Sequence, residues 1–207
     1  MNPVGRPGEE FCMECGPDTG LHSGTNDRVA CCPRCGWERP LARRPVFVLT
    51  GASGAGKTTI AESLAGRLEG CAVFDVDLTL HVAALGWDVW RNTWLQLAHA
   101  VGMNGQATLL CGSVTAAQLA GLPARMLVGP VHEAVLDCPD HELVRRLSAR
   151  PTWRGSTTEW IAEQVRWAAV LRAEAAHGFD THGMGPDAVA AGVAAWVNSE
   201  LATEAAA

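Results

Sequence analysis

The sequence predicts an α/β domain on a parallel sheet over residues 45–202, preceded by a small metal-binding module over residues 1–40. From Val46 onward, short apolar runs alternate with helical stretches, which is the pattern of βαβ units. A glycine-rich segment ending in Lys-Thr-Thr follows the first of these runs directly. Two Cys-x-x-Cys pairs stand upstream, in a region rich in Gly and Pro with no apolar period.

The elements of the larger domain follow from apolar runs, helical periodicity and capping signals. Strands are expected where short apolar runs occur, at 46–50, 71–76, 107–111, 134–137 and near Phe179. Helices are expected at 57–68, 87–101, 115–122, 140–149, 158–176 and 187–201. Residues 156–159, Ser-Thr-Thr-Glu, form a capping box before the longest central helix. Residues 40–45 read as a linker.

Composition and charge limit the class of protein. The chain has 207 residues, of which 48% are hydrophobic, enough for a packed core. Its net charge is -6 and it has no basic block, so a nucleic-acid partner is not expected. No apolar run reaches the ~18 residues of a membrane span, and the first ten residues contain no apolar segment. We therefore expect no membrane partner and a cytoplasmic location.

Residues 51–59, Gly-Ala-Ser-Gly-Ala-Gly-Lys-Thr-Thr, match the phosphate-binding pattern G-x-x-x-x-G-K-[ST] between a strand and a helix. The glycines allow a tight turn whose N–H groups point inward, and the helix directs its positive end to the same place. Lys57 is expected to reach the β- and γ-phosphates, and Thr58 to bind Mg²⁺. ATP is the expected donor, with GTP left open. The predicted nucleotide-binding residues of this loop are Gly51, Ser53, Gly54, Ala55, Gly56, Lys57, Thr58 and Thr59.

Lys57 is the only lysine among sixteen basic residues. A lysine kept where arginine serves everywhere else indicates a need for a compact ammonium on a slim stem. The sequence thus singles out Lys57 as a catalytic residue.

Two acidic residues, Asp75 and Asp77, close the second predicted strand. Ligands of open α/β sheets bind at the carboxyl ends of strands, so we expect this pair at the site. Asp77 is the preferred base for an attacking hydroxyl and Asp75 the group on the metal side, although swapped roles or a merely solvated strand end stay open. No acid follows the third strand, at 109–113, which disfavours motor ATPases and GTPases.

Four arginines fall within ten residues, at 145–154, where a helix runs into a Pro/Gly loop. Arg146 and Arg150, spaced i,i+4, are expected on one face. Arg150 and Arg154 flank a segment that could close over the phosphates and neutralise the charge of phosphoryl transfer. The alternative is a solvated basic face.

These three segments together resemble the P-loop small-molecule kinases, such as chloramphenicol phosphotransferase, gluconate kinase, shikimate kinase and bacterial nucleoside kinases. The resemblance covers residues 46 to about 200 and rests on residues 51–59, 74–77 and 145–154. It implies a five-stranded parallel sheet in the order 2-3-1-4-5, a mobile lid, Asp77 as base, and a loop at 180–183 near the adenine. The cysteine-rich N-terminus is not part of that pattern.

The acceptor is expected over the second helix. Trp87, Trp90 and Trp94 share a helical face and could stack on a flat acceptor, although such a stripe is more often core. Arg91 and residues 112–113 are further pocket candidates. His81, His99 and His132 are expected to be structural.

Two pairs, Cys12 with Cys15 and Cys32 with Cys35, form a C-x₂-C…C-x₂-C set with sixteen residues between the pairs. Two such turns can bring four thiolates around Zn²⁺. The module resembles a zinc ribbon, and since the four sulfurs fill all positions the zinc should be structural. Cys31 could substitute for a neighbour. The module could brace the larger domain, line a pocket or mediate a homodimer.

The leading interpretation is an ATP-dependent kinase that phosphorylates a hydroxyl of a small metabolite, nucleoside or antibiotic-like compound. A nucleoside monophosphate kinase is the nearest alternative, but it needs a basic acceptor pocket, and Arg91 is the only Lys or Arg between residues 78 and 120. A nucleotide-dependent switch or nucleic-acid-binding ATPase, with the ribbon for recognition, is the third interpretation.

Overall fold

The computed structural model describes residues 11–12, 14–20, 22–23, 29–154 and 156–206. The chain forms two compact units. The first unit comprises Met1–Val46, Asp77–Thr108 and Ala116–Val131, and the second comprises Phe47–Val76, Leu109–Thr115 and His132–Ala207. The predicted domains, 1–40 and 45–202, stay a prediction.

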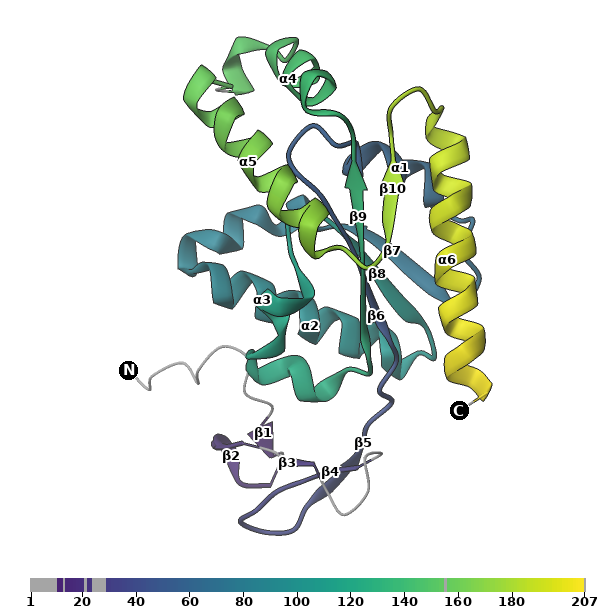
Figure 1. The fold of residues 1–207 in the computed structure, drawn as a ribbon. Coiled ribbons are helices and arrows are strands. Elements are labelled where there is room, and N and C mark those ends of the chain that lie inside the picture. The colour runs from purple at the N-terminus through teal and green to yellow at the C-terminus, as the bar shows by residue number, and fades with distance from the viewer. Residues whose placement is uncertain (1–10, 13, 21, 24–28, 155, 207) are drawn as a thin grey trace. The chain divides into compact units, whose positions relative to one another are not determined.

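Five parallel strands form the main sheet, in the order β10-β9-β6-β8-β7 (Figure 1). In chain order these are β6 (Val46–Thr50), β7 (Cys71–Asp75), β8 (Ala107–Cys111), β9 (Val131–Asp137) and β10 (Gly178–Asp180). The order is 2-3-1-4-5 in terms of the sheet's own strands, as the resemblance implied. All five residues of β6 are buried, as are those of β8, because central parallel strands are covered on both faces. Gly178 pairs with Val135 and Asp180 with Asp137 at the β9–β10 edge.

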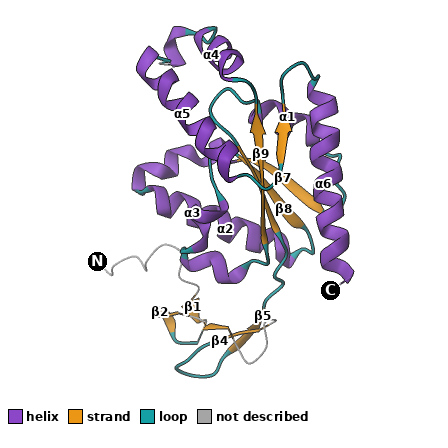
Figure 2. Cartoon of the chain, viewed as in Figure 1, coloured by secondary structure: helices purple, strands orange, loops and turns teal. Residues whose placement is uncertain are grey.

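Each predicted helix corresponds to an α-helix of the structure, but the ends differ from the predicted ends (Figure 2). They are α1 (Lys57–Leu64), α2 (Trp87–Met103), α3 (Ala116–Ala120), α4 (Asp140–Ser148), α5 (Thr158–Glu174) and α6 (Pro186–Ala206). Helix α1 ends four residues before its predicted end, since Gly66 (φ 73°) is left-handed. Thr157, not Ser156, caps α5, accepting from the Trp160 N–H.

Three short 3₁₀ segments were not predicted: η1 (Val76–Leu85), η2 (Pro123–Leu127) and η3 (Thr152–Arg154). Segment η1 is interrupted at Thr79, whose φ/ψ of -112°/19° is not helical. Residues 76–82 alternate apolar and polar side chains, a period of 2 that is typical of a strand, so periodicity did not indicate a 3₁₀ segment here.

In the second unit, α1 packs against α6 and against β7, and α4 packs against α5. Figure 1 shows the long α6 (yellow) alongside β10 and α4 (green) beyond the end of β9, with α5 (green) packed against α4. A core beneath α4 and α5 contains Ala52, Cys138, Leu143, Leu147, Ile161 and Ala168. Because Ala52 belongs to the segment after β6, this core anchors that segment to both helices.

The N-terminal part of the first unit contains five short strands. They are β1 (Phe11–Cys12), β2 (Gly16–Gly20), β3 (His22–Ser23), β4 (Val29–Cys31) and β5 (Glu38–Pro40). Strands β1 and β2 form one antiparallel hairpin, and β3-β4-β5 form a second small antiparallel sheet. Two small sheets that each carry one cysteine pair are the arrangement expected of a zinc ribbon.

The same unit joins β5 and the following residues to α2. Arg39 hydrogen-bonds through Nη2 to His99 Nε2 at 2.9 Å, and His99 is buried. A Cβ on Gly102 would lie 2.8 Å from the Ala42 carbonyl oxygen, so α2 approaches the 41–45 segment closely. Asn92 is buried and accepts the Ala124 N–H at 2.9 Å, which fixes η2 to α2. In the described part of the chain, none of the helices has the length and apolar character needed to cross a bilayer.

Candidate functional site

The loop between β6 and α1 has the conformation of a phosphate cradle. Gly51 has φ 156°, and a Cβ there would lie 2.6 Å from the Leu136 carbonyl oxygen of β9. Gly56 is left-handed (φ 108°) and is the N-cap of α1, with no side chain capping the helix. Only glycine fits either position without strain. The first turn of α1 therefore directs its N–H groups and its positive dipole end into the loop.

The Lys57 side chain folds back onto this loop, and its ammonium group binds loop carbonyl groups. Lys57 Nζ donates to the carbonyl oxygens of Gly51 (2.8 Å) and Ala52 (2.9 Å). The next two residues, Thr58 and Thr59, are exposed on the first turn of α1. Ser113, from the segment after β8, donates its hydroxyl to the Gly51 oxygen at 3.3 Å. The residues predicted for phosphate and Mg²⁺ binding thus lie together at one end of β6.

Two of the predicted arginines contact the loop. Arg150 Nη1 donates to Ser53 Oγ at 3.0 Å, and Arg146 Nη1 donates to the Gly54 oxygen at 3.3 Å. Helix α4 ends at Ser148, so Arg150 lies just past the helix. The expectation that Arg146 and Arg150 share one helical face is therefore wrong. Burial and the nearby charge of Arg154 lower the pKa of the Arg150 guanidinium. Arg154 itself stacks on the exposed Trp153 ring at 5.2 Å.

Glu142 positions Arg146 and was missed in the sequence. Its carboxylate accepts from Arg146 Nε (2.7 Å) and from Arg145 Nε and Nη2 (2.7 and 2.8 Å), and the residue is buried. These hydrogen bonds lower the pKa of the Glu142 carboxyl to about 2 from 4.5. The i,i+3 and i,i+4 spacing of Glu142 with two arginines was the available signal.

Gln164 of α5 is the second residue that sequence reasoning missed. Its Oε1 accepts the Ser53 N–H of the loop at 2.9 Å. The two residues are 111 positions apart, so no local pattern connects them. Only the packing of α5 on the loop brings them together.

A pocket of 260 Å³ adjoins the loop. Its walls come from the loop, the start of α1, and the segment after β10, with Arg146 between them. The lining residues are Gly54, Ala55, Gly56, Thr59, Ile60, Arg146, Thr181, Met184, Pro186 and Val189. Arg146 also donates to the Thr181 Oγ1 (2.9 Å) and carbonyl oxygen (2.8 Å). The edge of its guanidinium is therefore held by protein groups on three sides.

The two carboxylates predicted after the second strand occupy different elements. Strand β7 ends at Asp75, and Asp77 lies in η1, where it is exposed. Because the strand ends at Asp75, the two carboxylates do not lie on one strand. Asp75 belongs to the second unit, as does the phosphate loop, whereas Asp77 belongs to the first.

Asp75 and Lys57 share a neighbour in Cys111, the last residue of β8. Burial, followed by the negative charge of Asp75, raises the pKa of the Cys111 thiol to about 12, and the positive charge of Lys57 opposes this. Asp75 therefore lies on the same edge of the sheet as the loop lysine.

The predicted tryptophan stripe is mostly core. Trp90 and Trp94 are buried, whereas Trp87 is exposed. The Trp90 indole donates to Thr79 Oγ1 at 3.1 Å, and the Trp87 ring packs edge-on against Trp90 at 5.7 Å. Arg91 stacks over Trp87 at 5.9 Å and pairs with Asp88 at 3.0 Å. One indole of the three is therefore available to a ligand.

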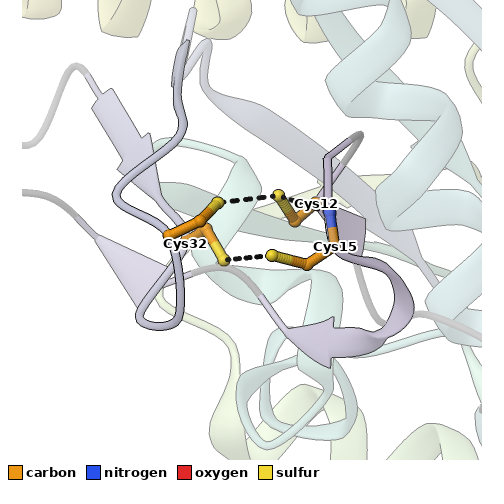
Figure 3. A group of neighbouring side chains, drawn as sticks. Cys12, Cys15 and Cys32 are labelled. Atoms are coloured by element: carbon orange, nitrogen blue, oxygen red, sulfur yellow. Dashed lines mark hydrogen bonds between the residues drawn. The ribbon is translucent and has the colours of Figure 1, made fainter.

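The four predicted zinc ligands, Cys12, Cys15, Cys32 and Cys35, form one cluster with all four sulfurs within 4.8 Å of one another. Figure 3 labels Cys12, Cys15 and Cys32 and shows their sulfurs turned toward a common centre. The Cys12–Cys35 and Cys15–Cys32 sulfur separations are 3.6 and 3.9 Å. Bonds of about 2.3 Å to one zinc place tetrahedral sulfur ligands about 3.8 Å apart, so the cluster fits that ion.

Backbone donors complete the surroundings of the sulfurs. The N–H groups of Glu14 and Cys15 donate to Cys12 Sγ at 3.3 and 3.4 Å, and that of Arg34 donates to Cys32 Sγ at 3.4 Å. Burial raises the pKa of the Cys32 thiol, but hydrogen bonds from the N–H groups of Cys35 and Arg34 lower it, and the resulting pKa is about 7. The hydrogen bond with Cys35 and burial raise the pKa of Cys15 to about 12. Four thiols this close do not ionise together without a cation, and a divalent metal supplies that charge.

No protein-family model and no curated protein matches this sequence. Solved structures do resemble it. The tunicamycin resistance protein of Deinococcus radiodurans superposes with a TM-score of 0.55 at 22% identity, over 75% of this chain and 96% of that one. A sugar kinase from Janibacter sp. superposes with a TM-score of 0.52 at 18% identity, over 75% of this chain and 94% of that one. Together with the sheet order, these likenesses show that this chain shares its α/β fold with these two proteins.

Proposed function

We propose that this protein is an ATP-dependent phosphotransferase that moves the γ-phosphate of ATP to a hydroxyl of a small molecule. The observation that carries the proposal is the loop after β6, where a left-handed N-cap glycine, an uncapped helix start and the sole lysine of the chain meet. An uncapped helix N-terminus with an ammonium beside it is a site for polyphosphate. The superposed sugar kinase supports the same reaction class.

The donor side of the site is assigned to the loop and its neighbours. Loop N–H groups and Lys57 would hold the phosphates, and the exposed Thr58 hydroxyl would ligate Mg²⁺. The nucleoside would occupy the 260 Å³ pocket against Arg146 and Thr181. Bound Mg²⁺-ATP supplies the transferable phosphoryl group and part of its charge neutralisation.

The acceptor side is assigned to the carboxylates. Asp77, exposed in η1, would accept the proton of the attacking hydroxyl, and Asp75 would orient the metal's water. Arg150, held at Ser53, would balance charge on the transferring group, with Arg154 next to it. The four-cysteine cluster is assigned to a structural zinc, since four protein sulfurs leave no position for water or substrate.

A lysine-specific protection experiment tests the donor site. An amine-acetylating reagent has one side-chain target, Lys57, whose modification can be quantified by peptide mass spectrometry. We expect Mg²⁺ with a non-hydrolysable ATP analogue to slow acetylation of Lys57 at least tenfold. Free Nα-acetyl-lysine in the same tube serves as the unprotected control. Equal acetylation rates of Lys57 with and without saturating nucleotide would contradict the proposal.

A further inference from the structure

The second cysteine pair leads directly into a strand that contacts helix α2 in the same unit. Residues 32–37 form a tight turn, which we call the second knuckle. Within it the Cys32 N–H donates to the Trp37 carbonyl oxygen at 2.8 Å, and the Gly36 N–H donates to the Cys32 carbonyl oxygen at 2.9 Å. Strand β5 begins at the next residue and pairs with β4, whose Ala30 is buried. The position of β5 therefore depends on the cysteine cluster.

The segment that follows the second knuckle contacts the C-terminal half of α2. Arg39 Nη2 of β5 donates to Nε2 of the buried His99 at 2.9 Å. Gly102, one turn further along the helix, is also buried, and a Cβ there would lie 2.8 Å from the Ala42 carbonyl oxygen. The two backbones therefore meet closely enough that only glycine fits at this point of the helix.

Arg44 extends this contact to the C-terminus of α2. Its Nε donates at 2.9 Å to the carbonyl oxygen of Gly105, two residues past the end of the helix. A cationic group at that end is favourable, because the last carbonyl groups of a helix carry partial negative charge. The N-terminal half of α2 has other partners, since Trp90 hydrogen-bonds to η1 and Asn92 to η2.

The cysteine-rich module is too small to hold its shape by apolar burial alone. Modules of fewer than about 40 residues usually need a metal, disulfides or a partner to fold. Because a metal site of this kind forms only in the folded module, the free energy of metal binding is also folding free energy. Elements that pack on the module share in that stabilisation, and α2 is such an element.

We propose that zinc in the four-cysteine cluster stabilises the C-terminal half of α2 through the contacts of Arg39, Ala42 and Arg44. The ribbon is then an internal brace for α2. The inference rests on the structural zinc assigned as part of the proposed function. Coupling between two sites is reciprocal, so a change that weakens the contact with α2 must lower the affinity for zinc by the same factor.

Hydrogen exchange with and without zinc tests where the stabilisation acts. We expect removal of zinc from the full-length protein, by EDTA under reducing conditions, to speed amide exchange in residues 95–103 about tenfold or more. Residues 87–92 should respond less, and α1 and α6 of the second unit should keep their rates. Unchanged exchange in residues 95–103, or equal acceleration in α1 and α6, overturns the inference.

Zinc affinity in variants tests the reciprocal effect. In EGTA-buffered Zn²⁺ solutions, we expect Arg39→Gln and His99→Leu each to raise the Kd for zinc about fivefold or more. The double variant should bind zinc no more weakly than the weaker single variant, because both changes remove one contact. The matched controls, Glu38→Gln at an exposed position of β5 and Leu97→Gln at an exposed position of α2, should keep the wild-type Kd.

The results of this titration separate the inference from the proposed function. A wild-type Kd in Arg39→Gln, or an additive loss in the double variant, overturns the inference and leaves the zinc assignment in place. A protein that neither contains zinc nor binds it when added overturns the assignment and the inference together. The nucleotide site is tested independently by protection of Lys57.

Discussion

Lys57 illustrates how one side chain can be both a structural and a chemical group. Its ammonium spans the carbonyl oxygens of Gly51 and Ala52 at 2.8 and 2.9 Å. A polyphosphate in the loop would offer the same ammonium charged oxygens, which are stronger acceptors than carbonyl groups. The loop is thus held in shape by the group that would bind its ligand.

Substitution of Lys57 by arginine tests whether shape matters as well as charge. We expect Lys57→Arg to lower kcat by roughly 10²-fold or more. The planar guanidinium of arginine is too broad for the position that the ammonium occupies between two carbonyl groups and a phosphate. Steady-state kinetics with a coupled ADP assay measures the loss. Activity within a few-fold of wild type would show that only the charge is needed.

Replacement of each candidate carboxylate separates the base from the metal-side group. We expect Asp77→Asn to lower kcat by about 10²–10⁴-fold and to leave ATP-analogue affinity unchanged. Asp75→Asn should instead raise the Mg²⁺ concentration needed for half-maximal rate. The reverse pattern would assign the base to Asp75.

Helix α4 acts as a support for the nucleotide pocket because one buried acid holds two of its arginines. Glu142 fixes Arg146, and Arg146 in turn joins Gly54 to Thr181 across the pocket. A rigid guanidinium plane at a pocket wall costs a ligand less ordering entropy than a mobile one. Helix α4 as a whole, and not Arg146 alone, therefore shapes this wall of the pocket.

The depressed pKa of Glu142 predicts a pH dependence of stability. The carboxyl has a pKa of about 2 in the folded protein against 4.5 in the unfolded chain. Its contribution is complete above pH 4.5 and is lost as the pH falls toward 2. We expect Glu142→Gln to be destabilised relative to wild type at pH 7, with a gap that narrows at pH 3. Urea unfolding at both pH values measures the gap, with Glu69→Gln as an exposed control.

The assignment of zinc to the four-cysteine cluster can also be tested directly. We expect about one zinc per chain by elemental analysis of the purified protein, and loss of that zinc in Cys32→Ser. Cys31→Ser, one position away in β4, is the matched control and should keep the metal. Zinc retained in Cys32→Ser but lost in Cys31→Ser would exchange their roles.

For the molecule as a whole, the donor site is assembled from distant parts of one unit. Ser53, Gln164, Arg146 and Thr181 come from the loop, α5, α4 and the segment after β10. A ligand in that site should therefore stabilise the folded chain by mass action.

Mg²⁺ with an ATP analogue at about a hundred times its Kd should add about 2.7 kcal/mol to the free energy of unfolding. For a chain of this length, that corresponds to a Tm increase of roughly 5–10 °C. Thermal melts followed by circular dichroism provide the measurement, and Lys57→Ala should remove most of the shift. A wild-type Tm that does not respond to nucleotide would argue against binding in the loop.

The sequence alone predicted the fold class of the protein. The phosphate loop, with its strand and helix, and the spacing of the four cysteines were predicted from short sequence patterns, whereas the sheet order was predicted from the resemblance to a known family. Strand β6 and strand β8 were predicted at their observed bounds, because a fully apolar run between turn residues has few other uses. Such features depend on neighbours along the chain.

Packing settled the rest. Gln164 could be recognised as a site residue only in the folded structure, since its hydrogen bond to Ser53 joins residues 111 positions apart. Glu142 has a local i,i+4 pairing with Arg146, but only the tertiary structure places that arginine at the loop. The separation of Asp75 from Asp77 depends on where β7 ends, and the exposure of Trp87 beside buried Trp90 and Trp94 depends on what covers each face of α2. The sequence indicates which side chains have chemistry suited to the site, and the packing of the elements determines which of them lie together.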